Sequence, residues 1–255
     1  GGGRLEHRRL RGPDGRPGMN EPFPGDVPRR PGIRPGQPWG TEVSGPADLE
    51  VAGGDGMLAA VLTRGLEDPL VRFAAAPESD LARAVGLVAG AVPGGLALPL
   101  DALELRPGDG GPAPPRVAVN SVVVGVAPDR LRAWHRPVGL AVHIDGAAVD
   151  AAGATTLVVM NGQYLRGLDV SPRGHPGDAV AEAQLYGLRP GVRRAMRSRL
   201  ATGAHLPHPA ITVRKARLVT VRAARPVPLE VDGEPAGRIT ALEVRLRPAA
   251  YRLFI

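Results

Sequence analysis

The sequence predicts an α/β + β protein: a small parallel α/β lobe followed by an antiparallel β-sandwich lobe. From about residue 48, short apolar strands alternate with helical segments, the order that builds a parallel sheet. From Arg116 onward, most apolar segments are short, rich in valine and bounded by turns, which is typical of antiparallel strands. A chain of 255 residues with 43% hydrophobic content is sufficient for one large domain or two small ones.

Residues 1–46 are predicted to be a disordered leader. They are rich in proline, glycine and arginine and show neither the period of a helix nor that of a strand. Met19 lies inside this segment and is an alternative start of the protein. The α/β lobe is then expected over residues 47–103 and the β-sandwich lobe over residues 104–255.

Two strand–helix pairs form the predicted α/β lobe. In order, they are a strand at 48–53, a helix at 57–66, a strand at 69–77 and a helix at 79–87. Ser79 has the side chain of a helix N-cap, and Gly86 is placed to end the same helix.

The predicted β lobe consists of strands with one helical segment among them. A crossing strand is expected at 96–105, further strands at 116–127, 138–144, 154–161, 179–188, 211–221, 228–231 and 241–247, and a helix at 192–203. Asp145-Gly146 and Asp232-Gly233 are dipeptides that favour tight hairpin turns between such strands.

The net charge of +7 is carried almost entirely by arginine, since Lys215 is the one lysine. Such a charge suits nucleic acid, anionic membranes or phosphates, and a coding bias toward Arg, Ala, Gly and Pro produces it equally well. No motif or set of aromatic residues offers a stacking platform, so we expect no nucleic-acid partner. The absence of cysteine excludes disulfides, thiolate metal sites and a cysteine nucleophile.

No apolar run approaches the roughly 20 residues that span a bilayer, and no apolar segment follows the basic N-terminus as in a secretory signal. We therefore expect a cytoplasmic protein that can lie at the periphery of a membrane. Arginines of the predicted helix region are candidates for contact with anionic headgroups, although an ordinary solvated helix face has the same composition. These residues are Arg189, Arg193, Arg194, Arg197 and Arg199.

The segment Gly53-Gly54-Asp55-Gly56 is a candidate phosphate-binding loop. It lies between a predicted strand and a predicted helix, where glycines let backbone N–H groups approach a phosphate and the helix N-terminus favours negative charge. Asp55 is placed to help position a Mg²⁺ ion bound to phosphate. The same four residues also suit a simple tight turn.

With its surroundings, this loop resembles the G-G-D-G-T nucleotide loop of diacylglycerol, sphingosine and NAD kinases. Further matches to the diacylglycerol kinase-like lipid kinases follow in the family's order over roughly 200 residues. They are Asp80, Ala82 and Arg83 in the second nucleotide loop, Asp101 in the crossing strand, Asn120 and Gly125, Asn161-Gly162, Pro172 and Asp178, and finally Asp232-Gly233-Glu234.

The sequence departs from this family mainly in the nucleotide lobe. Met57 replaces the threonine of the first loop, and the polar residues of the next turn are alanines. The other replacements are Ala59, Ala60, Ala76, Pro77 and Ser79, with Arg166-Gly167 in place of a triple glycine. Nothing in residues 1–46 resembles the family's N-P-x-x-G loop.

The resemblance implies transfer of the γ-phosphoryl group of ATP, with Mg²⁺, to a hydroxyl of a diacylglycerol-type or sphingoid lipid. Glu234 is then the general base and Asp232 orients it or the metal. The implied cofactor-binding residues are Gly53, Gly54, Asp55, Gly56 and Asp80, and Asp178 is implied at a structural metal site. The alternative is a pseudokinase that binds lipid or protein without catalysis, since the replaced residues include groups that would hold ATP. The sequence predicts neither the particular lipid nor the oligomeric state.

Overall fold

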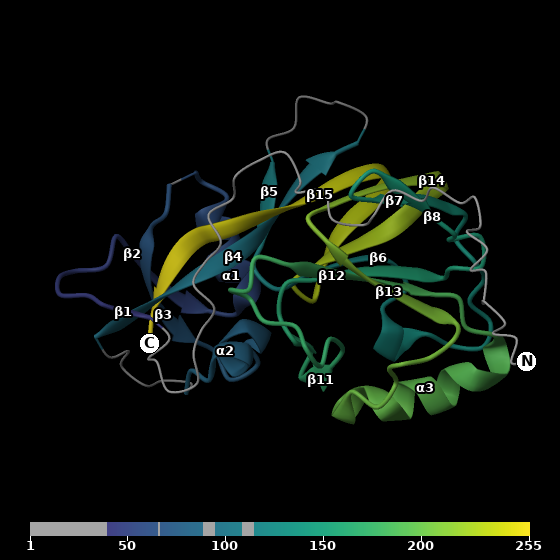
Figure 1. The fold of residues 1–255 in the computed structure, drawn as a ribbon, viewed down its shortest axis with the longest axis horizontal. Helices are drawn as coiled ribbons and strands as arrows, with labels where there is room; N and C mark the ends of the chain where they lie inside the picture. The colour runs from purple at the N-terminus through teal and green to yellow at the C-terminus, as the bar shows by residue number, and fades with distance from the viewer. Residues whose placement is uncertain (1–39, 66, 89–94, 109–114) are drawn as a thin grey trace, which may run out of the picture. The chain divides into compact units, whose positions relative to one another are not determined.

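A computed structural model describes residues 40–65, 67–88, 95–108 and 115–255 (Figure 1). The predicted fold class is confirmed: a small α/β lobe precedes an antiparallel β-sandwich lobe. Within the described residues, thirteen strands join one continuous sheet, and a separate short hairpin completes the strands. The expected leader lies outside the described residues up to residue 39.

The α/β lobe contains the strands β1 (Thr41–Glu42), β2 (Leu49–Gly53), β3 (Leu70–Ala75) and β4 (Leu96–Pro107), and the helices α1 (Asp55–Leu62) and α2 (Asp80–Val85). β2 pairs in parallel with β3, as the alternating pattern predicts. The Ser79 hydroxyl accepts a hydrogen bond from the Ala82 N–H, and Gly86 ends α2 with a φ of 75°, so both predicted caps of α2 are present. A core of buried apolar side chains joins the helices to the sheet, among them Leu58, Phe73, Leu81, Leu100 and Tyr251.

The β-sandwich lobe begins with β5 (Arg116–Ala118), β6 (Ser121–Gly125), η1 (Pro128–Arg130), β7 (Leu140–Ile144), β8 (Ala147–Val149), β9 (Thr156–Met160), β10 (Tyr164–Leu165) and β11 (Leu168–Asp169). It continues with β12 (Ala181–Tyr186), η2 (Pro190–Val192), α3 (Arg193–Arg199), η3 (Leu200–Thr202), β13 (Ile211–Ala216), β14 (Leu218–Val231) and β15 (Glu234–Phe254). The strand order β15-β14-β6-β9-β12-β13 is antiparallel throughout.

The two layers of the sandwich separate along β14. The first part of this strand pairs with β7 and its last three residues pair with β6, while β15 lies along its other edge. The space between the layers is filled mainly by Ala, Val and Leu, as the low aromatic content requires. A second apolar cluster, which includes Met160, Tyr186, Met196 and Leu200, holds α3 against the outer face of the sheet.

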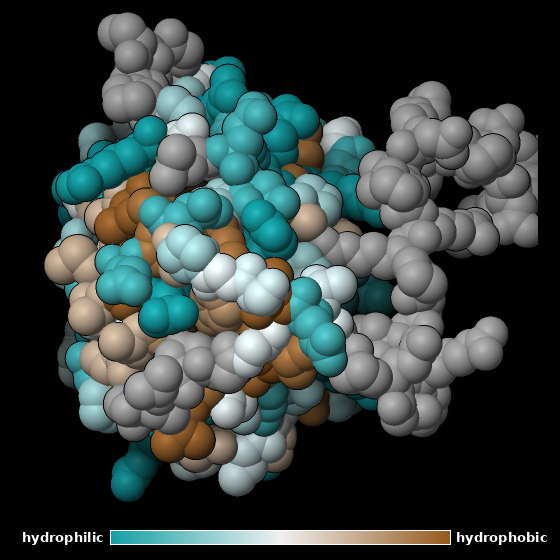
Figure 2. Space-filling model, turned by 90° about the vertical axis from the view of Figure 1, so that its left-hand side faces the viewer, coloured by the Kyte–Doolittle hydropathy of each residue, from teal (hydrophilic) through white to brown (hydrophobic). Residues whose placement is uncertain are grey.

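Two long strands run through both lobes. β4 crosses the division expected at residues 103 and 104, and β15 returns to the α/β lobe, where Arg252 and Leu253 pair in parallel with Leu70 and Val71 of β3. Figure 2 shows the end of the molecule that lies on the left in Figure 1, where hydrophobic residues lie among hydrophilic ones on the surface.

Several other boundaries differ from the sequence pattern; for example, the strands expected at 228–231 and 241–247 are parts of the longer β14 and β15. The leader was expected to extend to residue 46, but Thr41–Glu42 pair with β4 as β1. The strand predicted at 116–127 is interrupted after β5, because the N–H groups of residues 119–121 bond to the side chain of Asp232 rather than to a neighbouring strand. The strand predicted at 211–221 is divided at Arg217 into β13 and β14.

Candidate active site

Four chain segments meet around a cavity of about 680 Å³. They are the loop that begins α1, the first turn of α2, the turn between β10 and β11, and the turn between β14 and β15. The lining contains the predicted residues Gly53, Gly54, Asp55, Gly56, Asp80, Asp232 and Glu234. The structure therefore brings together the predicted nucleotide loop and the predicted catalytic turn, which are separated by about 180 positions in the sequence.

Asp55 connects the glycine loop before α1 to the start of α2. Its buried carboxylate accepts hydrogen bonds from the Ser79 hydroxyl (2.5 Å) and from the Leu81 N–H (3.0 Å). Burial raises the pKa of Asp55 above its ordinary value, against the two hydrogen bonds, which lower it. Gly53 precedes it with a φ of 131°, a conformation that side-chain-bearing residues rarely adopt.

Asp80 joins α2 to the hairpin between β10 and β11. Its carboxylate accepts hydrogen bonds from the Gly167 N–H (2.7 Å) and from the Arg166 N–H. Burial raises its pKa, and the same hydrogen bonds oppose that rise. Arg83, one turn later, lines the cavity and places its guanidinium carbon 5.5 Å from the centre of the Tyr164 ring.

Asp232 is half-buried in the turn between β14 and β15. Its carboxylate accepts three backbone hydrogen bonds, from Val119 (3.0 Å), Asn120 (2.8 Å) and Ser121 (2.9 Å). Burial raises the pKa of Asp232 to about 7, although these N–H groups lower it, and the nearby Asp55 carboxylate adds to the rise. Asp232 thus holds the bend between β5 and β6 while facing the acidic side of the cavity.

Glu234 is exposed, unlike the three aspartates of the cavity. Its carboxylate lies against the first turn of α1: a Cβ atom added to Gly56 would be 3.3 Å from Glu234 Cδ. The N-terminal turn of a helix attracts negative charge through its N–H groups and dipole. The side chain is therefore accessible to a ligand in the cavity and lies beside the glycine loop.

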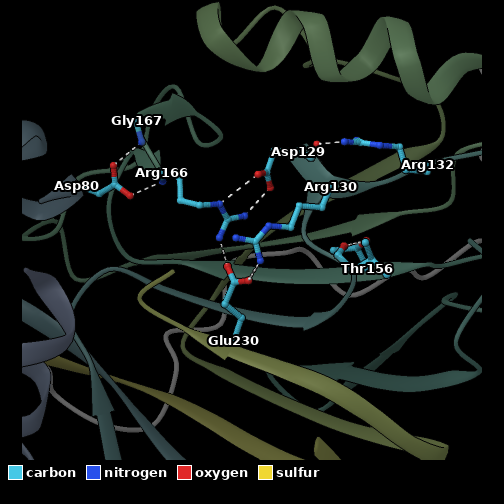
Figure 3. Close-up of polar contacts among 9 residues, drawn as sticks. Asp80, Asp129, Arg130, Arg132, Thr156, Arg166, Gly167 and Glu230 are labelled. Atoms are coloured by element: carbon cyan, nitrogen blue, oxygen red, sulfur yellow. Dashed lines mark hydrogen bonds and ion pairs between the residues drawn. The ribbon is translucent and has the colours of Figure 1, made fainter. Parts of the chain in front are cut away.

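Arg166 and its partners are the part of the site that the sequence pattern did not reveal. Its guanidinium binds the Asp129 carboxylate through two nitrogens and also binds Glu230, which pairs in turn with Arg130 at 3.1 Å (Figure 3). Burial alone would lower the pKa of Arg166, but hydrogen bonds to Asp129 and Glu230 raise it. The sequence signal was the replacement of a glycine-rich segment by Arg166-Gly167, which gave no indication of these partners.

The side chains of Asn161 and Asn120 bind backbone carbonyl groups of segments near the cavity. The Asn161 side-chain amide donates to the carbonyl oxygens of Asp101 (2.9 Å) and Val119 (2.8 Å). The Asn120 amide donates to the Tyr164 carbonyl oxygen at 2.7 Å. A Cβ atom on Gly162 would lie only 2.3 Å from Asn120 Oδ1, which explains the glycine of the Asn161-Gly162 pair.

Asp178 lies apart from the residues that line this cavity. Its carboxylate accepts the Val180 N–H at 3.0 Å. In the described part of the chain, no three His, Cys, Asp or Glu side chains gather as a metal site. The metal role of Asp178 stays a prediction.

Comparison with known proteins identifies a domain family and similar folds. Residues 122–255 match the family model of the YegS C-terminal NAD kinase beta sandwich-like domain. Among solved structures, a diacylglycerol kinase from Bacillus anthracis str. Sterne is similar, with a TM-score of 0.63, 16% identity, and coverage of 81% of this chain and 76% of that one. An NAD kinase from Archaeoglobus fulgidus in complex with ATP gives a TM-score of 0.45, with 15% identity and coverage of 82% and 78%. No curated protein has a significantly similar sequence.

The fold and the matched domain define a diacylglycerol kinase-like protein, so the resemblance seen in the sequence is confirmed. The chain belongs to the family of the YegS C-terminal NAD kinase beta sandwich-like domain. No helix among the described residues is long and apolar enough to cross a membrane.

Proposed function

We propose that this protein is an ATP-dependent lipid kinase of the diacylglycerol type. It would transfer the γ-phosphoryl group to a lipid hydroxyl. The observation that carries the proposal is the meeting of the Gly53–Gly56 loop and the exposed carboxylate of Glu234 on one cavity. A phosphate-binding loop and a proton acceptor side by side are the two groups that this reaction requires from the protein.

Glu234 is the proposed general base. Its carboxylate would accept the proton of the lipid hydroxyl, whose oxygen then bonds to the γ-phosphorus as the bond to the β–γ bridging oxygen breaks and ADP leaves. Asp232 would fix the turn that carries Glu234, through its three backbone hydrogen bonds. Arg83, which also lines the cavity, would supply a cationic group for the phosphates.

The cavity fits a polyphosphate only if a cation accompanies it. Five of its lining residues are acidic, and the Asp55 charge adds to the effect of burial in raising the pKa of Asp232, so like charges face one another. Mg²⁺ would neutralise phosphate charge here, with Asp55 and Asp232 as the residues placed to hold it. Because Mg²⁺ keeps several waters and takes phosphate oxygens as ligands, it needs no cluster of three protein carboxylates.

A second candidate function is binding without catalysis. Met57 is 55% exposed and lines the cavity together with Ala60, at positions where the related kinases are expected to carry polar residues. These apolar groups offer no hydrogen bonds to ATP. On this reading the protein would bind a lipid or another protein without catalysis, and the acidic turn would remain only as a hairpin.

The test is transfer of labelled phosphate from Mg·ATP to a panel of extracted lipids, with the Glu234→Gln variant alongside. We expect label in one lipid class and a loss of about 10²-fold or more in the variant, because general-base catalysis contributes that much. Glu67→Gln, an exposed substitution outside the cavity, is the matched control and should keep the wild-type rate.

A thermal-shift measurement with Mg·ATP separates the two candidates. A ligand that binds the folded state raises its stability, so a kinase should show a shift that grows with the concentration of Mg·ATP. No label in any lipid and no shift would favour binding without catalysis. Label that persists in Glu234→Gln would contradict the role given to Glu234.

A further inference from the structure

Trp134 is the most exposed aromatic side chain among the described residues, with 75% of its surface accessible. It lies in the loop 131–136, which follows η1 on the α3 side of the β-sandwich lobe. Val192, which is 41% exposed, directly precedes α3. An aromatic ring held in water is costly unless another surface covers it, so its setting is informative.

The loop around Trp134 is fixed to α3 by arginines that have no carboxylate partner in their hydrogen bonds. Arg193 is buried, and one of its terminal nitrogens donates to the carbonyl oxygens of Arg132 (2.8 Å), Ala133 (3.2 Å) and His135 (2.6 Å). Arg197 donates likewise to the Leu131 carbonyl oxygen. Trp134 is therefore presented by a rigid loop, which lowers the entropy lost when a partner covers it.

The loop and α3 carry mainly positive charge. Residues 130–136 contain three arginines and residues 187–203 contain five, and neither segment contains an acidic residue. The adjacent carboxylate of Asp129 is paired with Arg166. Arg136, Arg189, Arg194 and Arg199 have exposed side chains. Burial and then the neighbouring guanidiniums of Arg132 and Arg194 lower the pKa of Arg197, which reflects the same positive field.

We propose that loop 131–136 and α3, together called the α3 surface, form a binding site for bilayers that contain anionic phospholipid. Arginine guanidiniums would contact the headgroup phosphates, and the Trp134 ring would enter the interfacial layer, where amphipathic aromatic rings are favoured. A single exposed aromatic residue gives no stacking platform, so the surface suits a bilayer better than a nucleic acid.

The α3 surface is connected to the cavity through η1. Asp129 of η1 binds Arg166 of the cavity wall, and its carbonyl oxygen accepts a hydrogen bond from Arg132 at 3.2 Å (Figure 3). The proposed membrane site rests on the proposed function, because a lipid kinase must reach a substrate that resides in a membrane. Binding to vesicles is measured without ATP, so it can fail while kinase activity is found, or the reverse.

The test uses the full chain and vesicles of phosphatidylcholine, with and without one quarter phosphatidylglycerol. The Trp39→Phe background leaves Trp134 as the sole tryptophan, since the chain has two. We expect sedimentation with the anionic vesicles only, a blue shift of Trp134 fluorescence on binding, and loss of binding at high salt. In the chain with both tryptophans, Trp134→Ala should weaken binding about tenfold or more, as removal of a buried aromatic ring does.

Charge reversals locate the site. Arg136→Glu and Arg194→Glu should each weaken vesicle binding about tenfold or more, because each arginine near an anionic surface contributes on the order of 1 kcal/mol and reversal adds repulsion. Arg64→Glu makes the same charge change in the α/β lobe and should bind within about twofold of wild type. Absence of binding to anionic vesicles, binding without a fluorescence shift, or equal losses in all three variants would overturn the proposal.

Discussion

The carboxylate of Asp232 belongs both to the fold and to the candidate site. Three backbone N–H groups from residues 119–121 bond to it, so the bend between β5 and β6 depends on a side chain more than 110 positions later. Glu234, two residues later, lies beside Gly56 at the start of α1. The aspartate of the D-G-E turn is thus a structural joint here, beside the glutamate that we propose as the base.

The titration of Asp232 should appear in the pH dependence of stability. Its pKa is about 7 in the folded protein against an ordinary value of 3.8, so between these values the folded state binds more protons than the unfolded chain. The free energy of unfolding should therefore fall as the pH rises from about 4 to about 7. Asp232→Asn keeps an acceptor oxygen but cannot ionise, and should lose less stability than wild type between pH 5 and pH 8 in urea denaturation.

The exposed Asp150→Asn is the control for this comparison and should follow the wild-type pH dependence. The unfolding free energy of Asp232→Asn should still fall somewhat with rising pH, because burial also raises the pKa values of Asp55 and Asp80. Identical slopes for wild type and Asp232→Asn would show that Asp232 is already ionised at pH 5.

Gly162 is a residue whose identity is set by packing alone. The site for a Cβ atom is occupied by the Oδ1 atom of the buried Asn120 side chain, 2.3 Å away. Gly162→Ala must displace that side chain and its hydrogen bond to Tyr164, and should cost about 2–3 kcal/mol of unfolding free energy. Gly153→Ala, at a turn with no atom within 4 Å of the new Cβ, is the matched control and should change stability little. Equal effects in urea denaturation would refute the close-packing explanation.

At the scale of elements, the short hairpin of β10 and β11 is the piece that connects the lobes at the cavity. The N–H groups of its turn bond to Asp80 of α2, and the Arg166 side chain reaches Asp129 and Glu230 in the β lobe. One two-residue turn thus contacts three elements, which explains how so short a hairpin forms a wall of the site.

Arg166→Met is the substitution that tests this connection. It leaves the Asp129 and Glu230 carboxylates with less compensation, and should lower the unfolding free energy by about 1–3 kcal/mol, since Arg166 is partly buried. Arg245→Met removes the exposed pair with Glu243 and should cost less than about 0.5 kcal/mol. The double variant Arg166→Met/Asp129→Asn should lose less unfolding free energy than the two single variants lose together. Strict additivity of the two losses would argue against the network.

At the scale of the whole described molecule, β4 and β15 make the lobes parts of one sheet. β15 starts at the Asp232-Gly233-Glu234 turn, crosses the sandwich and ends between β3 and β4 of the α/β lobe. Shared strands couple the lobes because neither can lose its end of β15 without disturbing the other. We therefore expect the described parts of the two lobes to unfold in one cooperative transition.

Leu253→Ala tests this coupling from the far end of β15. Leu253 is fully buried in the α/β lobe, and the truncation should cost about 2–5 kcal/mol. In a Trp39→Phe background, the urea midpoint followed by Trp134 fluorescence, in the other lobe, should fall together with the midpoint followed by circular dichroism. Val88→Ala, at a 73% exposed position in the α/β lobe, should leave both midpoints nearly unchanged. Separate transitions for the two signals would show that the lobes unfold independently.

The sequence by itself determined the fold class, the caps of α2, the two Asp-Gly hairpins, and the membership of the nucleotide loop and the D-G-E turn in one kinase-like pattern. The fold class, the caps and the hairpins follow from local physics: apolar periodicity selects strands or helices, an N-cap needs only its own turn, and a positive φ favours Asn, Asp or Gly. The kinase-like pattern came instead from the resemblance of the motifs, in their order, to a known family.

Only the tertiary structure decided the partners of the charged groups and the division of the lobes. The Arg166–Asp129–Glu230 network, the hydrogen bonds of Asp232 to residues 119–121 and the return of β15 to β3 all join positions 37 to more than 180 residues apart. Contacts at such separations depend on how strands pair across the whole sheet, and strand pairing leaves no periodic trace within either segment. The sequence could therefore point to the residues of the site, but not to which of them face a ligand and which hold the walls together.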